Sequence, residues 1–305
     1  HRQQHLSQSS HQLRNSLRLS SRAQAAAPLL PAMQWRLYLP FLPTFLSLTA
    51  AWSLPFPVTP GSNSAREIPT FDRLAWQTAR VAVHVLNYRA SSPNNLLILG
   101  EVKRATVQDF PGNRHKYEIQ FTTEDFKTSQ KVGACSATVI FENKEPRPFV
   151  DVNCSSNKSR KRVQEYDYNL YKVFKKQKMP ITANEIPDSN GFVDPSEEPL
   201  RDMAMAGSSF LMWEKSTENL HYNLAQIKNV RQWMSKDGFL DFDYNIVLHE
   251  IPTQEMVPCH MRIMWFPGQH MKVKYYCDHV PRPEESEEGS TGGQSEEGSA
   301  FYGNF

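Results

Sequence analysis

The sequence lacks the common signatures of an enzyme. It contains no Gly-rich phosphate-binding loop and no Ser set among the small residues of a nucleophile elbow. His249-Glu250 begins like the helical zinc-protease motif, but Thr253 stands where the second His is required, and Pro252 is incompatible with the helix. We therefore expect a protein that is not an enzyme, with no catalytic residues, no cofactor and no metal of its own.

A strong net charge is also missing. The chain has 34 basic and 32 acidic residues, a net charge of +2, so no overall field favours nucleic acid as a partner. The charges are unevenly placed, however, because residues 158–178 are rich in Lys and Arg and residues 284–297 are acidic. We interpret the first segment as a solvated helix face and residues 280–305 as a disordered acidic tail.

Long apolar runs are scarce, and the main one resembles a secretory signal. Met33 and Arg36 precede the apolar run Leu37–Ala51, and small residues follow where a signal peptidase would cleave. The run is shorter than the roughly 20 apolar residues that a membrane span needs. The sequence thus predicts a secreted protein, or one held at a membrane by an uncleaved signal. The expected segments are a disordered or artefactual extension (1–32), a signal peptide or signal anchor (33–53) and a Pro-rich linker (54–70).

The rest of the chain repeats itself at a nearly constant offset. The matching landmarks are Tyr88 and Trp213 (125 residues apart), Val102 and Ile227 (125), Cys135 and Cys259 (124), and Cys154 and Cys277 (123). Four landmarks in the same order indicate one duplicated supersecondary unit. We expect an α+β fold with two tandem lobes, at residues 71–156 and 199–279.

Each repeat is predicted to hold one helix followed by four strands. In the first, Thr70 is placed to cap a helix that ends near Ser91. In the second, the helical stripe runs from Leu200 to Leu211. The predicted strands are Leu96–Thr106, Lys116–Thr122, Cys135–Glu142 and Phe149–Cys154, then Leu220–Met234, Leu240–Glu250, Cys259–Trp265 and Met271–Cys277.

Residues 157–198 are expected to connect the lobes through a further helix, Lys161–Lys178. Its apolar residues recur at helical spacing, which predicts a buried stripe that fixes the orientation of the lobes. The stripe consists of Val163, Tyr166, Leu170, Val173 and Phe174.

The four Cys fit an oxidising compartment. Since each repeat brackets a hairpin with two Cys, we expect disulfides Cys135–Cys154 and Cys259–Cys277. A zinc site at the second pair, with His260, His270 and His279 nearby, is the less favoured alternative, because the spacing matches no common zinc motif. Asn153 and Asn157 begin glycosylation sequons, and Asn157 is the better candidate because a disulfide Cys occupies the middle of the other.

The segment Ile251–Pro258 joins two predicted strands of the second repeat and has Pro near both ends. Proline-limited loops lose less entropy when a partner immobilises them. The segment is therefore either a recognition loop or a stiff connection without a partner, and this feature alone does not separate the two.

Several stretches of the chain resemble the latexin family of proteinase inhibitors, and the Cys pairs, signal and acidic tail are similar to its secreted members. The resemblance implies two cystatin-like lobes, each with a helix on a curved antiparallel sheet, joined by a connecting helix. It also implies reversible inhibition of a zinc metallocarboxypeptidase, whose active-site funnel a loop of the second lobe blocks. The matching stretches are Gly112–Tyr117, Pro180–Gly191, Gly207–Trp213, Leu248–Pro258 and Ile263–Gly268. The inhibitory loop carried over by this resemblance is Gln254, Glu255, Met256, Val257 and Pro258.

One departure favours an alternative function. Cys259 stands where latexin has a Trp after the loop, and the disulfide expected there would tether the next strand. The alternative is an extracellular matrix, eggshell-matrix or adhesion protein that keeps the fold without inhibition. Inhibition of cysteine proteases is not expected, because neither Val107–Gly112 nor Trp233–Gly238 carries a Gln-x-Val-x-Gly hairpin.

Overall fold

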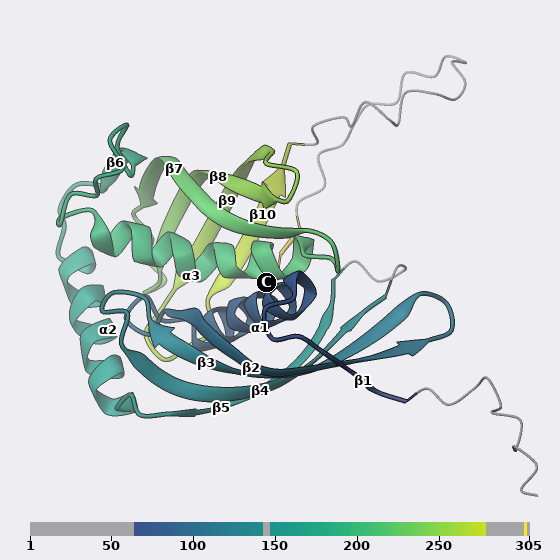
Figure 1. Cartoon of the computed structure of the whole chain (residues 1–305). Coiled ribbons are helices and arrows are strands. Elements are labelled where there is room, and N and C mark those ends of the chain that lie inside the picture. Colours follow the sequence, from purple (N-terminus) through teal and green to yellow (C-terminus); the bar gives the residue numbers. More distant parts are fainter. Residues whose placement is uncertain (1–63, 143–146, 279–301, 304–305) are drawn as a thin grey trace, which may run out of the picture. The chain divides into compact units, whose positions relative to one another are not determined.

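A computed structural model describes residues 64–142 and 147–278, together with the backbone of residues 302–303. The described residues form an α+β fold of two lobes, each with an antiparallel sheet and a long helix (Figure 1). This confirms the tandem arrangement predicted from the repeat. The predicted extension (1–32) and signal (33–53) lie outside the described residues, as does most of the acidic tail.

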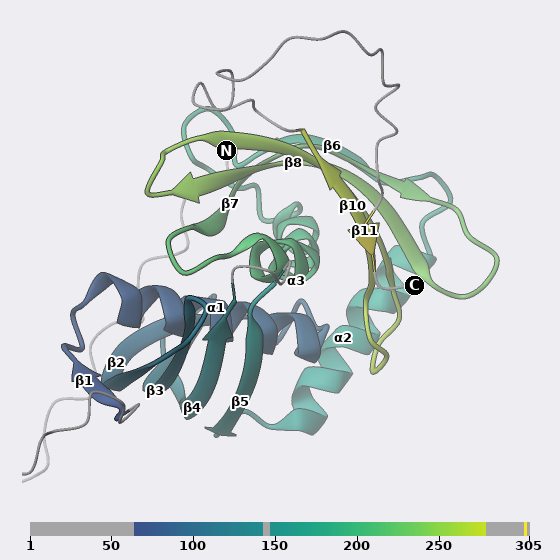
Figure 2. The same ribbon diagram turned by 90° about the vertical axis from the view of Figure 1, so that its right-hand side faces the viewer.

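The first lobe is a five-stranded sheet with strand order β1-β2-β3-β4-β5, and helix α1 contacts β2 to β5 (Figure 2). Asp72, rather than the predicted Thr70, caps α1, because its side chain accepts from the Leu74 amide at 2.7 Å. The helix ends at Ser91, as the sequence predicted, and Ser91 adopts a left-handed conformation there. The elements are β1 (Arg66–Ile68), α1 (Arg73–Ala90), β2 (Leu97–Phe110), β3 (Arg114–Asp125), β4 (Lys131–Phe141) and β5 (Phe149–Ser156).

The second lobe is a six-stranded sheet with strand order β11-β10-β9-β8-β7-β6, and helix α3 contacts β7, β9 and β10. Two of its edge strands lie outside the predicted lobe 199–279, since β6 falls in the expected linker and β11 in the expected disordered tail. Both are short edge strands without a strong apolar alternation, which is why their sequences gave no strand signal. The elements are β6 (Thr182–Ile186), α3 (Glu198–Lys215), β7 (His221–Trp233), β8 (Leu240–Ile251), β9 (Met256–Trp265), β10 (Lys272–Cys277) and β11 (Tyr302–Gly303).

The connecting helix α2 spans Arg160–Lys175, and Ser159 caps it. Its buried face differs from the predicted stripe, because Tyr166 and Val173 are 54% and 55% exposed. The side chains that pack inward are those of Asp167, Leu170, Tyr171 and Phe174. Leu170 and Phe174 pack inward as predicted, whereas Asp167 and Tyr171 take the places expected for Tyr166 and Val173. Asp167 is buried and accepts a hydrogen bond from Asn94 at 2.9 Å.

The repeat extends to details of strand pairing. Register shifts interrupt β2 between Leu99 and Val102, and β7 between Leu224 and Gln226, at matching places in the two copies. A further shift in β4, between its pairings with Thr123 and Glu124, has no counterpart in β9. The bulge adds one residue to β4. This residue explains why the spacing between matching positions of the two copies is 125 before the bulge and 124 at Cys135.

The two lobes contact each other through equivalent positions. Tyr88 of α1 and Trp213 of α3, the first landmarks of the repeat, have ring centroids 6.1 Å apart. Trp213 Nε1 donates to the Pro148 carbonyl at 3.0 Å, and Trp265 Nε1 donates to the Ser91 carbonyl at 2.7 Å. Of these contacts, the Tyr88–Trp213 pair joins matching positions of the two copies, as residues near the two-fold axis of an isologous interface do. Burial of these rings and their paired N–H groups fixes one lobe on the other.

None of the helices in the described part of the chain has the length and apolar character needed to cross a membrane.

Candidate functional site

The candidate recognition loop is a short turn between β8 and β9, consisting of residues 252–255. The Glu250 amide donates to the Glu255 carbonyl and the Gln254 amide donates to the Glu250 carbonyl, both at 2.9 Å. Gln254 has φ 67°, so it adopts the left-handed conformation that closes the turn. Because two backbone hydrogen bonds close a segment of this length, the turn is a preformed feature of the surface.

Side chains of the turn reinforce this backbone. The Thr253 hydroxyl donates to Glu250 Oε1 at 2.9 Å, and the Tyr222 hydroxyl donates to the other oxygen of that carboxylate. Glu250 is only 4% exposed, so its carboxylate acts as a buried anchor for the turn. Gln254 Oε1 lies 3.1 Å from His249 Nε2. The side-chain amide of Gln254 is thereby directed by a neighbour in the same hairpin.

The first lobe contains the same turn between β3 and β4. There the Asp125 amide donates to the Gln130 carbonyl and the Ser129 amide donates to the Asp125 carbonyl, both at 2.8 Å. Ser129 has φ 52°, and the Thr128 hydroxyl donates to Asp125 Oδ1 at 3.1 Å. Each of these residues lies 125 positions before its counterpart in the second lobe. The predicted loop is thus one of two copies of a common turn, although the sequences of the two turns differ at most positions.

A family profile described as Latexin matches residues 68–283. The match covers both lobes and the connecting helix. The chain belongs to the latexin family.

Individual relatives of this latexin-family chain agree with the profile. Retinoic acid receptor responder protein 1 of Homo sapiens is 42% identical over 228 residues, which are 72% of this chain and 78% of that protein. Ovocalyxin-32 of Gallus gallus is 39% identical over 228 residues, covering 75% of this chain and 82% of that protein. Latexin of Mus musculus is 32% identical over 210 residues, covering 68% and 95%.

Solved structures of mouse fetuin-B are a more distant match to this latexin-family chain. Alone and in complex with crayfish astacin, they share 11% and 13% identity, with a TM-score of 0.27 in both cases. They cover 72% of this chain and 71% and 70% of their own. A likeness at this level carries no argument about fold or function.

The structure divides the five predicted loop residues of this latexin-family chain between the turn and β9. Gln254 is exposed and Glu255 is half-buried within the turn, whereas Met256, Val257 and Pro258 belong to β9. Met256 is 55% exposed, but Val257 is only 7% exposed and lies in the core of the second lobe. Val257, which the family resemblance places in the inhibitory loop, is therefore not exposed to a partner, because strand alternation turns its side chain inward.

Both expected disulfides are present, and each joins directly paired residues of neighbouring strands. Cys135 of β4 is bonded to Cys154 of β5, and Cys259 of β9 to Cys277 of β10. The second bond takes up both sulfurs that the zinc alternative requires. Since Cys259 follows the turn by only four residues, the disulfide anchors the strand that leaves it.

The two sequon residues lie on the surface of the first lobe. Asn153 is an exposed residue of β5, opposite Ser136 of β4. Asn157 is exposed just after β5, where its backbone amide donates to the Val132 carbonyl at 3.0 Å. Both side chains are accessible, and their glycosylation stays a prediction.

Proposed function

We propose that this chain is a reversible protein inhibitor of a zinc metallocarboxypeptidase and that the β8–β9 turn enters the mouth of the enzyme's active-site funnel. Membership of the latexin family supports the inhibitor class. The observation that carries the site is the exposure of a hydrogen-bonded turn, in which Pro252, Thr253 and Gln254 are all exposed. The side chains of Thr253 and Gln254 contact Glu250 and His249 of β8, within the same hairpin. A preformed protruding turn loses little conformational entropy on binding.

The chemistry of the turn fits a contact with a polar funnel mouth. Gln254 supplies an amide that both donates and accepts, and Glu255 supplies a carboxylate close to the backbone of the turn. Met256 begins β9 and offers a flexible apolar side chain beside them. Any zinc in the complex belongs to the enzyme.

A secreted location accompanies this proposal. Two disulfides are supported where the compartment is oxidising, and the predicted signal at residues 33–53 directs the chain there. A secreted zinc carboxypeptidase is then the partner that the chain would meet.

The test is a titration of a pancreatic-type carboxypeptidase with the purified protein, followed by the same titration with Met256→Ala and Gln254→Ala. We expect each substitution to raise the inhibition constant about tenfold, which corresponds to about 1.4 kcal/mol of binding free energy. Met234→Ala is the matched control, because Met234 is also 55% exposed and lies near the opposite end of β8, about 30 Å from Met256 by strand rise.

The control variant should inhibit like the original protein, within twofold. Equal weakening by Met234→Ala and Met256→Ala would move the contact away from the turn. An absence of inhibition at micromolar protein would refute the proposal for this enzyme class, and the matrix or adhesion function would be the remaining candidate.

A further inference from the structure

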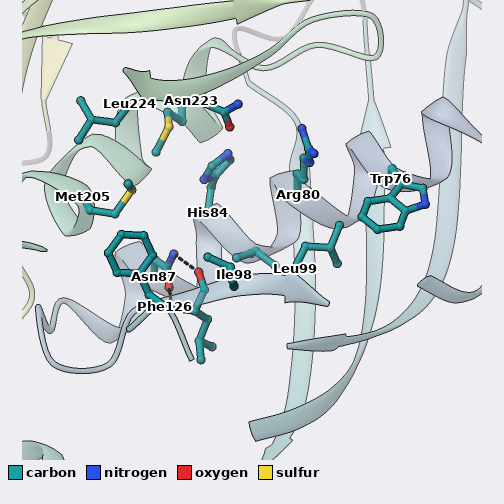
Figure 3. A pocket seen from close by; sticks show the side chains of 13 residues that line it. Trp76, Arg80, His84, Asn87, Ile98, Leu99, Phe126, Met205, Asn223 and Leu224 are labelled. Atoms are coloured by element: carbon teal, nitrogen blue, oxygen red, sulfur yellow. Dashed lines mark hydrogen bonds between the residues drawn. The ribbon is translucent and has the colours of Figure 1, made fainter. Parts of the chain in front are cut away.

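A cavity of about 320 Å³ lies between the two lobes. This is within the size range of small-molecule sites in proteins. Its walls come from α1, β2 and the β3–β4 turn of the first lobe and from α3 and β7 of the second (Figure 3). Most of the lining is apolar, including Trp76, Leu99, Phe126, Met205 and Leu224.

One cation lines this interlobe cavity. The Arg80 guanidinium has its Nη1 2.8 Å from His221 Nε2, and among the described residues no carboxylate forms an ion pair with it. Burial lowers the pKa of Arg80, which reflects the cost of holding this charge in a partly apolar site. The guanidinium therefore has donors to offer to an anion that enters the cavity.

A buried imidazole lies beside this cation. Arg80 and His84 are four residues apart on α1 and project from the same side of the helix (Figure 3). His84 bonds to the backbone of Tyr222, and its buried Nε2 has no hydrogen-bond partner among the described residues. Leaving such an atom unpaired costs free energy that a polar ligand atom recovers.

No carboxylate is among the described residues that line the cavity. Burial, with His221 and Arg80 nearby, lowers the pKa of His84 to about 4, and burial with Arg80, Arg73 and His249 nearby lowers that of His221 to about 4. Both rings are therefore neutral at pH 7. The positive potential in the cavity comes from the arginine guanidinium. Two amides also line the cavity. The Asn87 side chain donates to the Leu97 carbonyl at 2.9 Å and accepts from its amide at 2.8 Å, whereas Asn223 is an exposed residue at the cavity wall.

We propose that the interlobe cavity binds a small amphipathic monocarboxylate, of the class of medium-chain fatty acids. One carboxylate oxygen accepts from the Arg80 guanidinium, and the other accepts from His84 Nε2, which takes up a proton from solvent as the anion binds. The hydrocarbon chain lies against the apolar walls contributed by Phe126, Met205 and Leu224. A single guanidinium in an apolar cavity favours a monoanion with an apolar body over a phosphate, which carries more charge and needs more donors.

Binding of octanoate to the purified full chain tests this proposal by isothermal titration calorimetry. Octan-1-ol has a comparable apolar body without the charge, and butyrate has the charge without the body. We expect saturable 1:1 binding of octanoate, with octan-1-ol and butyrate at least tenfold weaker. Equal affinity for octanoate and octan-1-ol, or no saturable octanoate binding at millimolar concentration, would overturn the proposal.

Variants locate the bound molecule. Arg80→Gln should weaken octanoate at least tenfold, whereas Arg73→Gln, an exposed cation on the same helix that does not line the cavity, should change it less than twofold. Met205→Trp fills the cavity from α3 and should abolish binding. Unchanged affinity in either Arg80→Gln or Met205→Trp contradicts the site, and Met205→Trp decides alone if Arg80→Gln fails to fold.

Discussion

The β3–β4 and β8–β9 turns share one backbone but differ in what their side chains contact. In the first lobe, Phe126 packs against the core of the second lobe and lies under the Arg201 guanidinium, 5.0 Å from its ring centroid. The next residue, Lys127, places Nζ 2.7 Å from Asp202 Oδ2. This turn is therefore part of the contact between the lobes.

The corresponding residues of the second lobe cannot repeat these contacts, because they carry neither an aromatic ring nor a charge. Ile251 and Pro252 stand where Phe126 and Lys127 stand in the first copy, and Pro252 and Gln254 are exposed. The duplicated unit thus contains the same turn twice. The turn of the first lobe contacts the second lobe, and the turn of the second lobe is exposed at the surface. The comparison teaches that recognition in this fold depends on which copy of an element the interlobe contact leaves uncovered.

Removing the disulfides is expected to have the largest effect and tests the difference between the two turns. Replacing Cys135 and Cys154 by Ser, or Cys259 and Cys277 by Ser, opens loops of almost equal length, 19 and 18 residues. We expect each pair of substitutions to lower the free energy of unfolding by about 3 kcal/mol, measured by urea denaturation. Only the second pair should also weaken carboxypeptidase inhibition, because Cys259 anchors the strand that leaves the exposed turn. Weaker inhibition by the first pair alone would reverse the roles of the two lobes.

Lys127→Ala tests the contact between the β3–β4 turn and the second lobe. The side chain of Asp202 is 1% exposed, so removing Lys127 leaves a buried carboxylate with Arg201 as its remaining partner, at 3.2 Å. We expect a loss of about 2 kcal/mol in unfolding free energy, less than for a fully buried pair because the Lys127 side chain is 42% exposed.

The control variant for Lys127→Ala is Lys103→Ala. Its ion pair with Glu101 lies on the surface of the first lobe, and its removal should cost less than about 0.5 kcal/mol. Similar losses for Lys127→Ala and Lys103→Ala would mean that the β3–β4 turn does not hold the lobes together.

Most of the fold could be predicted from the sequence because helices and long strands carry periodic apolar residues. The helix stripe at Leu200, Met203 and Gly207 was recognisable for this reason, and a Cβ on Gly207 would lie 2.8 Å from Ile263 Cγ2. The short edge strands β1, β6 and β11 were missed, since a few residues carry no period. The buried face of α2 was misjudged because Tyr and Val are apolar enough to fit either face, and contact with the lobes decides which face is buried.

The candidate site was only partly predictable. A proline-framed segment marked the turn, but the inward direction of Val257 depends on where β9 begins, at Met256. The cavity between the lobes was not predictable at all. Arg80 and His221 are separated by 141 residues, and no local pattern indicates that they meet. Such a site is a property of the interlobe contact and appears only when the two copies are placed together.

The smallest expected effect tests whether the two turns are equivalent. Thr128 and Thr253 each donate a hydroxyl hydrogen bond to the carboxylate that precedes the turn, at 3.1 and 2.9 Å. Thr128→Ala and Thr253→Ala should therefore each lower the unfolding free energy by about 1 kcal/mol, as typical for one hydrogen bond. Each variant serves as the control of the other. Equal losses of stability, with weaker inhibition in Thr253→Ala only, would show that the same hydrogen bond stabilises both turns and that only the β8–β9 turn contacts the enzyme. A loss for Thr128→Ala with none for Thr253→Ala would show that the exposed turn is held by other contacts, and the equivalence of the copies would fail at the place where it matters for binding.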